Sequence, residues 1–235
     1  MVQIGDFIKS GGELLTELSV LKKKIKKVRA FVFDWDGVFN DARKNGRGES
    51  YFTEVDSMGT NLMRFGNWLM NKKQMPHSAI ISGEINDTAF YFIGREHFHA
   101  GYFKAKDKRI AWDDFCKKHK LKSEEIAFFY DDVLDLPLAK LAGISVCMHR
   151  TANPVFNAFV RKNKLADYIT GNPCGNFALR EACELVMFLQ GNSEQVLKER
   201  VAYSDLYTQF IQQRNKVSSK IFEQEIKGIK PGKTL

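Results

Sequence analysis

The sequence predicts an α/β fold built around a parallel sheet, and three observations lead to this prediction. From Arg29 onward, short apolar runs alternate with helical patterns of about 10–15 residues, as in βαβ units. The length of 235 residues suits one such domain with extra helices and is short for two domains of that size. Apolar residues make up 44% of the chain and charged residues 27%, which is typical of a globular protein and excludes wholesale disorder.

The first 28 residues are expected to form a helical extension that precedes the sheet. Apolar side chains such as Ile4, Phe7 and Leu18 recur at mixed helical spacings, and the Gly11-Gly12 pair interrupts them. A basic run at 22–27 ends the segment. Anionic lipid or nucleic acid could bind such a run, but a solvated helix end also explains it, because cations favour helix C-termini.

Residues 29–192 are expected to form the main domain, with strands and helices in alternation. The expected strands lie at 31–33, 78–81, 126–129, 144–147 and 168–169. The expected helices lie near 58–73, 84–94, 107–120, 135–142, 153–164 and 176–190.

Two further segments complete the prediction. Between the first strand and the first helix, residues 37–56 carry Asn45-Gly46 and Gly48 between extended stretches, which predicts a β-hairpin. Residues 193–235 are expected to be a C-terminal helical extension, with an amphipathic pattern that continues to about Lys227.

The charge of the chain is concentrated at its two ends. Residues 1–29 hold seven basic and three acidic residues, and residues 196–235 hold eight and four. The middle of the chain carries 21 residues of each sign and is neutral, so the main domain does not indicate a nucleic-acid partner.

The apolar runs and the cysteines indicate in which kind of compartment the protein is expected. No apolar run approaches the roughly 18 residues of a membrane span, and no signal peptide is apparent, which predicts a cytoplasmic protein. Four cysteines without a C-x-x-C pair are expected to be reduced core thiols rather than a zinc site or a disulfide framework.

Polar residues directly follow three of the predicted strands. They are Asp34 and Asp36 after the first strand, Ser82 and Gly83 after the second, and Asp131, Asp132 and Asp135 after the third. Because ligands of open parallel sheets bind outside the carboxyl ends of the strands, these side chains are expected to meet at one place.

The spacing and chemistry of these residues favour phosphoryl transfer. Asp34 and Asp36 are two residues apart, so an extended backbone directs both side chains to the same face. Crowded carboxylates repel one another unless a cation lies between them, and oxygen ligands without histidine or cysteine suit Mg²⁺. In such a site one carboxylate can attack phosphorus while the other carries a proton, and a metal and a lysine neutralise the phosphoryl oxygens. A single D-x-D pair can equally be a strand cap, and the prediction therefore depends on all three clusters.

These motifs resemble those of phosphatases of the haloacid dehalogenase (HAD) superfamily, over roughly residues 28–190. More closely, the chain resembles the 3-deoxy-D-manno-octulosonate 8-phosphate (KDO 8-P) phosphatase family, whose members lack a large cap domain. The matching segments are FDWDGV at 33–38, IISG at 80–83, DK at 107–108 and DDVLDLP at 131–137. The resemblance implies a HAD-like, Rossmannoid, doubly wound parallel sheet with a small β-hairpin flap and extra helices at both termini.

The resemblance also implies a role for each motif residue. Asp34 is the nucleophile and Asp36 the acid/base, while Ser82, Gly83 and Lys108 bind the phosphoryl group. Asp131 binds magnesium beside Asp34 and the main-chain carbonyl of Asp36, and Asp132 and Asp135 support the site.

The implied activity is that of a Mg²⁺-dependent phosphomonoesterase that works through an aspartyl phosphate. Its substrate would be a small phosphorylated sugar acid like KDO 8-P, an intermediate of lipopolysaccharide biosynthesis, and the enzyme would be a homotetramer. Two alternatives stay open. One is a phosphatase for another sugar or nucleotide monophosphate, and the other is a non-catalytic binding or regulatory protein that has kept the fold.

Four positions depart from the family pattern. Glu84 and Val55 replace arginines, and Lys104 replaces a glycine. Tyr130 replaces the glycine before the third acidic cluster, where its bulk and hydroxyl are expected near the metal. Lost arginines weaken recognition of an anionic sugar acid, for which Lys104, Lys106 or Arg64 could compensate.

Two histidine segments are further candidates for function. His149 and Arg150 follow the fourth predicted strand and could approach the crevice. His97 and His99 could form a metal pair, although alternation at a strand edge explains the same spacing.

Overall fold

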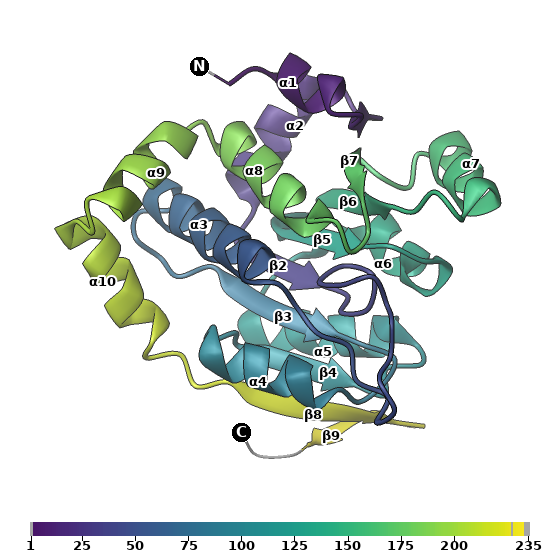
Figure 1. The fold of residues 1–235 in the computed structure, drawn as a ribbon. Helices are drawn as coiled ribbons and strands as arrows, with labels where there is room; N and C mark the ends of the chain where they lie inside the picture. Colours follow the sequence, from purple (N-terminus) through teal and green to yellow (C-terminus); the bar gives the residue numbers. More distant parts are fainter. Residues whose placement is uncertain (1, 227, 233–235) are drawn as a thin grey trace.

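The computed structural model describes residues 2–226 and 228–232 (Figure 1). In this part of the chain the strands are β1 (Glu13–Leu14), β2 (Ala30–Phe33), β3 (His77–Ile81), β4 (Ala100–Phe103), β5 (Ile126–Tyr130), β6 (Ile144–His149), β7 (Tyr168–Pro173), β8 (Lys220–Glu225) and β9 (Gly228–Pro231). The α-helices are α1 (Ile4–Lys9), α2 (Leu18–Lys24), α3 (Glu54–Met70), α4 (Asp87–Arg95), α5 (Lys108–His119), α6 (Leu136–Leu141), α7 (Pro154–Asn163), α8 (Ala178–Gln190), α9 (Ser193–Val201) and α10 (Asp205–Arg214). Short 3₁₀ turns are η1 (Ile25–Lys27), η2 (Ser123–Glu125) and η3 (Val133–Asp135).

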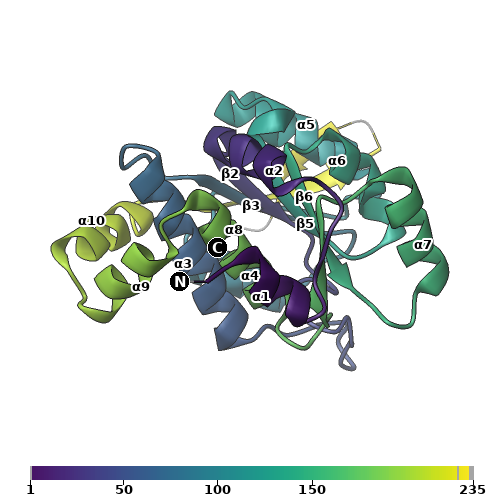
Figure 2. The ribbon, with the colours of Figure 1, turned by 90° about the horizontal axis from the view of Figure 1, so that it is seen from above.

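All the strands of the described residues belong to one sheet, in the order β1-β7-β6-β5-β2-β3-β4-β8-β9. Neighbouring strands from β7 to β8 pair in parallel, and only β1 and β9 pair antiparallel, at the two edges. Helices α3, α4 and α8 cover one face of the sheet, and α5 and α6 cover the other (Figure 2). The α/β fold with a doubly wound parallel sheet is thus confirmed.

Successive side chains of the central strand β2 point alternately into the hydrophobic cores on the two faces of the sheet. Every residue of β2 is buried, with Phe31 and Phe33 in the core beneath α3 and α8, and Ala30 and Val32 in the core beneath α5. A strand that is apolar on both faces is typical of a parallel sheet covered by helices on both sides.

The register of the central strands determines where the site forms. Phe33 of β2 lies opposite Ile80 of β3 and Phe129 of β5. The three strands therefore end at nearly the same level, and the residues that follow them emerge at the same edge of the sheet.

The predicted strands and helices of 29–192 all form, with ends shifted by a few residues, but β4 was not predicted. Its sequence, AGYF, is short and begins with two small residues. Gly101 is needed because a Cβ there would lie 2.4 Å from the side chain of Ile93. Strand identity in this segment therefore depends on its neighbours rather than on its own pattern.

The predicted hairpin at 37–56 is wrong in its secondary structure. No strand forms there, and residues 37–53, here called the flap loop, turn through hydrogen bonds between Asn45 and Glu49 and between Gly48 and Asn45. Gly48 has φ +77°, which favours glycine. Side-chain contacts, rather than a strand ladder, hold this loop.

The helix expected through Lys227 ends early. Helices α9 and α10 form, but Lys220–Glu225 becomes β8, which pairs with β4 and closes an otherwise open sheet edge. Ile221 of this strand is buried against the core. The strand forms because a pairing partner is present, which a local helical pattern cannot reveal.

The apolar stripe of the C-terminal segment packs on its own domain. Val196 and Phe210 are fully buried, and the ring of Phe210 lies 5.2 Å from that of Phe65 on α3. The indole Nε1 of Trp68 donates a hydrogen bond of 2.8 Å to Gln213. Part of this stripe is therefore buried within one chain, whereas Leu197 and Val201 on α9 are exposed.

Two smaller expectations can be checked on the described residues. All four cysteines are free thiols. Within the described ranges, no helix combines the length and apolar character needed to cross a bilayer.

Candidate functional site

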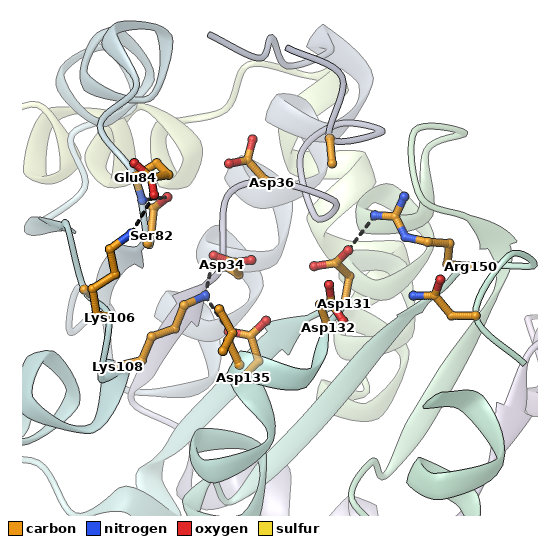
Figure 3. Close-up of a pocket in the computed structure, with 15 residues that line it drawn as sticks. Asp34, Asp36, Ser82, Glu84, Lys106, Lys108, Asp131, Asp132, Asp135 and Arg150 are labelled. Atoms are coloured by element: carbon orange, nitrogen blue, oxygen red, sulfur yellow. Dashed lines mark hydrogen bonds and ion pairs between the residues drawn. The ribbon is translucent and has the colours of Figure 1, made fainter. Parts of the chain in front are cut away.

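A pocket of about 470 Å³ lies at the carboxyl ends of the central strands (Figure 3). The residues that line it come from the loops after β2, β3, β4, β5 and β6, and they are Asp34, Asp36, Ala42, Ser82, Gly83, Glu84, Ala105, Lys106, Lys108, Asp131, Asp132, Leu134, Asp135, Arg150 and Asn153. The three predicted clusters do meet at one place.

Three buried carboxylates form the floor of the pocket. Asp34 follows β2, Asp131 follows β5 and Asp135 ends η3, and one oxygen of each lies within 4.8 Å of the others. The Asp34 amide donates to the carbonyl of Phe129 on β5, at 2.9 Å, which fixes the first carboxylate beside the second. Asp132 is exposed, and its carboxylate accepts from the Val133 amide at 2.7 Å, so it shapes the loop rather than joining the group.

Lys108, the first residue of α5, is the buried cation of the pocket. Its Nζ lies 2.6 Å from Oδ1 of Asp34 and 2.5 Å from Oδ1 of Asp135. Its side chain is only 5% exposed, so the charge interacts with these carboxylates and not with bulk water. The structure thus places the predicted phosphate-binding lysine directly beside the predicted nucleophile.

Burial and mutual repulsion act on the pKa values of the three carboxyl groups. Burial, followed by repulsion from Asp135, raises the pKa of Asp34 well above its ordinary value, although Lys108 opposes the shift. Burial likewise raises the pKa of Asp135, and that of Asp131 rises to about 7. Burial opposes the charge of Lys108, but Asp135 and Asp34 outweigh it and raise the pKa of the ammonium group.

The donor set fits a hard divalent cation. Burial and mutual repulsion raise the pKa values of the three carboxyl groups, so a bound cation would stabilise their ionised forms, and all the donors are oxygens, as Mg²⁺ requires. The predicted set named Asp34, Asp36 and Asp131, with Asp135 in support. In the structure the carboxylate of Asp135 joins those of Asp34 and Asp131, whereas that of Asp36 does not. For Asp36 the resemblance implied the main-chain carbonyl as the ligand.

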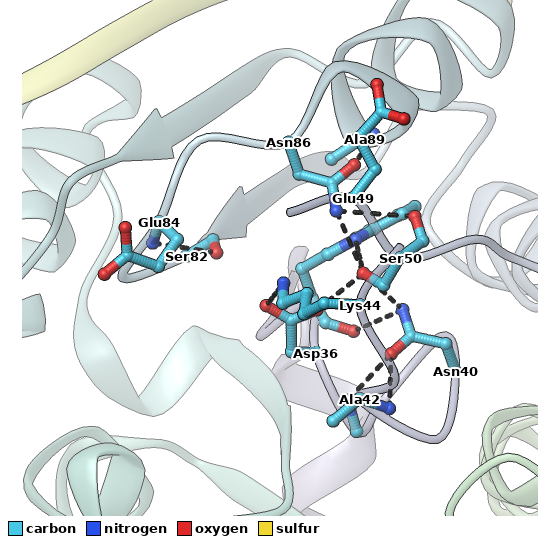
Figure 4. Close-up of polar contacts among 12 residues, drawn as sticks. Asp36, Asn40, Ala42, Lys44, Glu49, Ser50, Ser82, Glu84, Asn86 and Ala89 are labelled. Atoms are coloured by element: carbon cyan, nitrogen blue, oxygen red, sulfur yellow. Dashed lines mark hydrogen bonds and ion pairs between the residues drawn. The ribbon is translucent and has the colours of Figure 1, made fainter. Parts of the chain in front are cut away.

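Asp36 faces the flap loop instead (Figure 4). Its Oδ1 accepts a hydrogen bond of 2.6 Å from the Ser50 hydroxyl, and its Oδ2 lies 2.5 Å from Nζ of Lys44. The side chain is 24% exposed, so it can reach a molecule in the pocket. The two aspartates of the D-x-D pair therefore have different surroundings: Asp34 is buried beside Lys108, and Asp36 is partly exposed beside Lys44.

The loop after β3 forms another wall. Ser82 is buried at the end of this strand, and the Glu84 amide lies 3.4 Å from its Oγ. Glu84 pairs with Lys106 at 2.6 Å across the mouth, and both side chains are exposed. The acid that replaces the family's arginine is thereby neutralised by a lysine of the next loop.

Arg150 enters the pocket from the end of β6. Its Nη2 lies 2.6 Å from Oδ2 of Asp131. Gly37, with φ +82°, leaves room for this pair, because a Cβ there would lie 1.9 Å from Asp131 Oδ2 and 2.6 Å from the guanidinium. Of the two candidates at this strand end, Arg150 lines the pocket and His149 does not.

The expected effect of Tyr130 on the metal site is wrong. Its ring is fully buried in the core beneath α5, and its hydroxyl donates to the carbonyl of Leu165 at 2.9 Å. Alternation along β5 directs this side chain away from the pocket, since Asp131 next to it points inward. The tyrosine is a core residue.

Two of the three proposed compensating cations lie elsewhere. Arg64 is fully buried and donates to the main-chain carbonyls of Glu96 and His97. Lys104 pairs with Glu223 of β8 at 2.8 Å. Only Lys106 reaches the pocket, whereas Val55 is exposed at the start of α3, outside the lining.

Sequence reasoning did not identify two flap-loop residues that contact the acid/base candidate, Lys44 and Ser50. Neither belongs to a motif, and their positions depend on how an irregular loop folds back on β2. No signal in the sequence distinguishes them from other lysines and serines.

His97 and His99 do not form a pair. His99 instead packs with His77 and His119, with ring centroids 4.3–5.6 Å apart, at the opposite ends of the strands from the pocket. Burial, followed by the neighbouring histidines and an arginine near each, lowers the pKa of His77 to about 4 and that of His99 to about 2. The His99 Nδ1 accepts from the Ser78 amide at 3.2 Å.

This histidine cluster predicts acid sensitivity. Folding lowers the pKa of His99, so neutral His99 stabilises the folded protein. Its contribution to the free energy of unfolding is complete above the unfolded pKa of about 6.5 and is lost as the pH falls below that value. For His99 alone we expect a loss of about 2 kcal/mol between about pH 7.5 and pH 5, or about 4–8 °C in Tm. The variant His99→Asn, whose amide oxygen can still accept from Ser78, should show a smaller fall in Tm over that range.

The pocket carboxyl groups have raised pKa values, so their protonation stabilises the folded protein as the pH falls, opposite to the effect of His99. The quantity to measure is therefore the difference between variant and wild type in how Tm changes with pH. His149→Asn, outside the cluster, serves as the control. Identical pH slopes for His99→Asn and wild type would contradict the prediction.

Comparison with known proteins finds relatives with a similar sequence and fold. No family model matches the chain. The 3-deoxy-D-manno-octulosonate 8-phosphate phosphatase KdsC of Salmonella typhi is 27% identical over 179 residues, which cover 73% of this chain and 86% of that protein.

Solved structures agree. A protein described as a HAD superfamily (subfamily III A) hydrolase from Legionella pneumophila matches with a TM-score of 0.64 and 26% identity, over 79% of this chain and 96% of that one. The 3-deoxy-D-manno-octulosonate 8-phosphate phosphatase from Moraxella catarrhalis, in complex with magnesium ion, phosphate ion and KDO, shares the fold, with a TM-score of 0.64 and 23% identity over 77% of this chain and 98% of that one. With the motifs gathered at one edge of the sheet, these similarities support a phosphatase of the HAD superfamily, similar to the KDO 8-P phosphatases.

Proposed function

We propose that the protein is a Mg²⁺-dependent phosphomonoesterase that hydrolyses a small sugar phosphate through a phosphorylated Asp34. The observation that carries this proposal is the buried group of three carboxylates with Lys108 at 2.6 Å from Asp34. This arrangement provides a nucleophile, a phosphate-binding cation and a set of metal ligands in one pocket.

In the first half of the reaction, an oxygen of Asp34 attacks phosphorus. The bond from phosphorus to the ester oxygen breaks, its electron pair stays on that oxygen, and Asp36 donates a proton to give a neutral alcohol. Lys108 neutralises charge on the phosphoryl oxygens, and Ser82 and the Gly83 segment bind them from the β3 side.

In the second half, water attacks phosphorus and gives a proton back to Asp36. The bond between phosphorus and Asp34 breaks, which releases inorganic phosphate and restores both carboxyl groups. Magnesium held by Asp34, Asp131 and Asp135, when bound, would supply charge neutralisation for the phosphoryl group. The main-chain carbonyl of Asp36 is the further ligand that the resemblance implies.

For the substrate we propose a small sugar phosphate, with KDO 8-P as the first candidate because related phosphatases carry that name. Besides Lys108, the cations that line the pocket are Lys106 and Arg150, and both are paired with acids. A sugar or nucleotide monophosphate without a second acid group is therefore the second candidate, favoured by the Glu84–Lys106 pair at the mouth.

The test is phosphate release from p-nitrophenyl phosphate and from a panel of phosphorylated sugars, sugar acids and nucleotides, with Mg²⁺ and with a chelator. The proposal expects turnover that requires the metal, and a preferred member among the sugar phosphates. Absence of turnover on every ester with Mg²⁺ present would refute the enzymatic function and favour a binding role.

We further propose that the protein is a homotetramer. An apolar groove of about 560 Å³ adjoins the catalytic pocket, and both share Asp132 and Asn153. On its rim Val155 is 83% exposed and Phe159 51%, side chains that a neighbouring subunit could cover while it closes the site.

Light scattering after size exclusion should therefore give a mass of about four chains. The variant Phe159→Glu should lower the mass and the activity together while the melting temperature changes little. Val201→Lys, which alters a side chain 85% exposed on α9, is the matched control and should do neither. A monomeric wild type with full activity at micromolar concentration would refute the assembly.

A further inference from the structure

The Ser50 hydroxyl lies at the centre of a polar network beside Asp36 (Figure 4). Ser50 belongs to the flap loop and is fully buried. Its Oγ lies 2.6 Å from Asp36 Oδ1, 2.9 Å from the indole Nε1 of Trp35 and 2.9 Å from Nδ2 of Asn86. A longer contact of 3.3 Å joins it to Nδ2 of Asn40.

The direction of each hydrogen bond follows from the chemistry of the groups. An indole N–H and an amide NH₂ only donate, so Trp35 and Asn86 fill the two lone pairs of the Ser50 oxygen. The single proton of the hydroxyl must then point to its remaining close neighbour, Oδ1 of Asp36. Asp36 Oδ1 is therefore a committed acceptor.

We propose that Ser50 is the positioning residue of the acid/base: it holds Oδ1 of Asp36, so that Oδ2 is the atom that exchanges a proton with the ester oxygen and with water. This inference rests on the proposed phosphatase function and assigns a role to a residue outside its motifs. Lys44, whose Nζ lies 2.5 Å from Oδ2 and whose side chain is 34% exposed, is the counter-ion that leaves when the leaving group takes its place.

Three separate segments fix the hydroxyl. Trp35 lies between the two aspartates of the D-x-D pair, while Asn86 caps α4, its Oδ1 accepting from the Ala89 amide at 3.1 Å. Asn40 accepts from the Gly37 and Ala42 amides and so ties the start of the flap loop to the same network. A buried and fully bonded hydroxyl has one orientation, which is what accurate placement of a catalytic carboxylate requires.

The consequence differs between two kinds of ester. A sugar phosphate releases an alkoxide, a poor leaving group that needs the proton of Asp36 as the bond breaks. A p-nitrophenyl ester releases a stable phenolate that needs no such proton. Since kcat/KM reports the steps through formation of the phosphorylated enzyme, a misplaced Asp36 should slow the first ester and spare the second.

The experiment compares kcat/KM of wild type and Ser50→Ala on the best sugar phosphate of the panel and on p-nitrophenyl phosphate. We expect a loss of about 10–100-fold on the sugar phosphate and less than about 3-fold on the aryl ester. In an Asp36→Asn background, Ser50→Ala should cause no further loss on the sugar phosphate, because its effect acts through that carboxylate. Ser145→Ala removes another buried hydroxyl, far from Asp36 in the fold, and should change neither substrate.

The variant Trp35→Phe provides a second test if Ser50→Ala does not fold. It removes one of the donors that fix the orientation of the same hydroxyl, so its hold on Asp36 should loosen, with a smaller loss of the same selectivity. Equal losses on both esters, or additive losses with Asp36→Asn, would show a purely structural role and overturn the inference. Failure of wild type to hydrolyse either ester would instead overturn the proposed function, and the role of Ser50 with it.

Discussion

Asp34→Asn should abolish turnover while the protein stays folded. An amide nitrogen or oxygen is a poor nucleophile at phosphorus, and loss of a covalent nucleophile costs about 10⁴-fold or more in kcat. The fold should tolerate the change, because burial and repulsion from Asp135 already raise the pKa of the Asp34 carboxyl and the amide removes that repulsion.

Two measurements check this prediction. Steady-state release of phosphate gives the loss in kcat, and acid quenching after mixing with radiolabelled substrate shows whether phosphate is attached to the protein. Wild type should carry the label and the variant should not. Residual activity of about a tenth, or a labelled variant, would remove Asp34 as the covalent nucleophile.

Lys108→Met should be the most damaging single change to the metal-free protein. Its ammonium group lies between Asp34 and Asp135 at 2.6 and 2.5 Å, and without it three buried carboxylates share one pocket with no buried cation. Breaking a buried pair in this way costs about 3–5 kcal/mol, which corresponds to about 6–20 °C in Tm for a chain of this size. Loss of one charge-stabilising donor should also lower kcat by about 10²–10³-fold.

Denaturation in urea with and without Mg²⁺ measures the effect on stability. A cation bound among the carboxylates replaces part of the lost positive charge, so Mg²⁺ should raise the unfolding free energy of the variant more than that of wild type. Lys106→Met, at the same mouth but in an exposed pair, should change the unfolding free energy by no more than about 1 kcal/mol. A Lys108 variant as stable as this control would show that the buried carboxylates do not depend on the lysine.

Some residues of the site could be predicted from the sequence and others could not, and their positions in the fold explain the difference. Asp34, Ser82 and Asp131 each follow an apolar run, and parallel strands with a common register bring such residues together whatever the rest of the chain does. Arg150 and Lys44 approach from a strand end and a loop whose paths depend on long-range packing. Each is one of 36 basic residues, with nothing local to mark it.

For Tyr130 the sequence predicted a contact with the site that the structure does not contain. At the position where the family has a glycine, Tyr130 predicts a bulky neighbour of the metal. The alternation of β5 turns its ring into the core and its hydroxyl to Leu165, so only Asp131 enters the pocket. A residue next to a motif shares its position in the chain but not the direction of its side chain.

The sequence by itself determined the α/β class, the strands of the main domain other than β4, and the residues at their carboxyl ends. Apolar runs and the residues that follow them are local signals, and a buried parallel sheet requires them. The tertiary structure alone decided that β1, β8 and β9 extend the sheet, that the 37–53 segment is a loop and that Ser50 holds Asp36. Edge strands form where an open edge offers hydrogen bonds, and an irregular loop takes the shape that its buried polar groups dictate, so both depend on partners far away in the sequence.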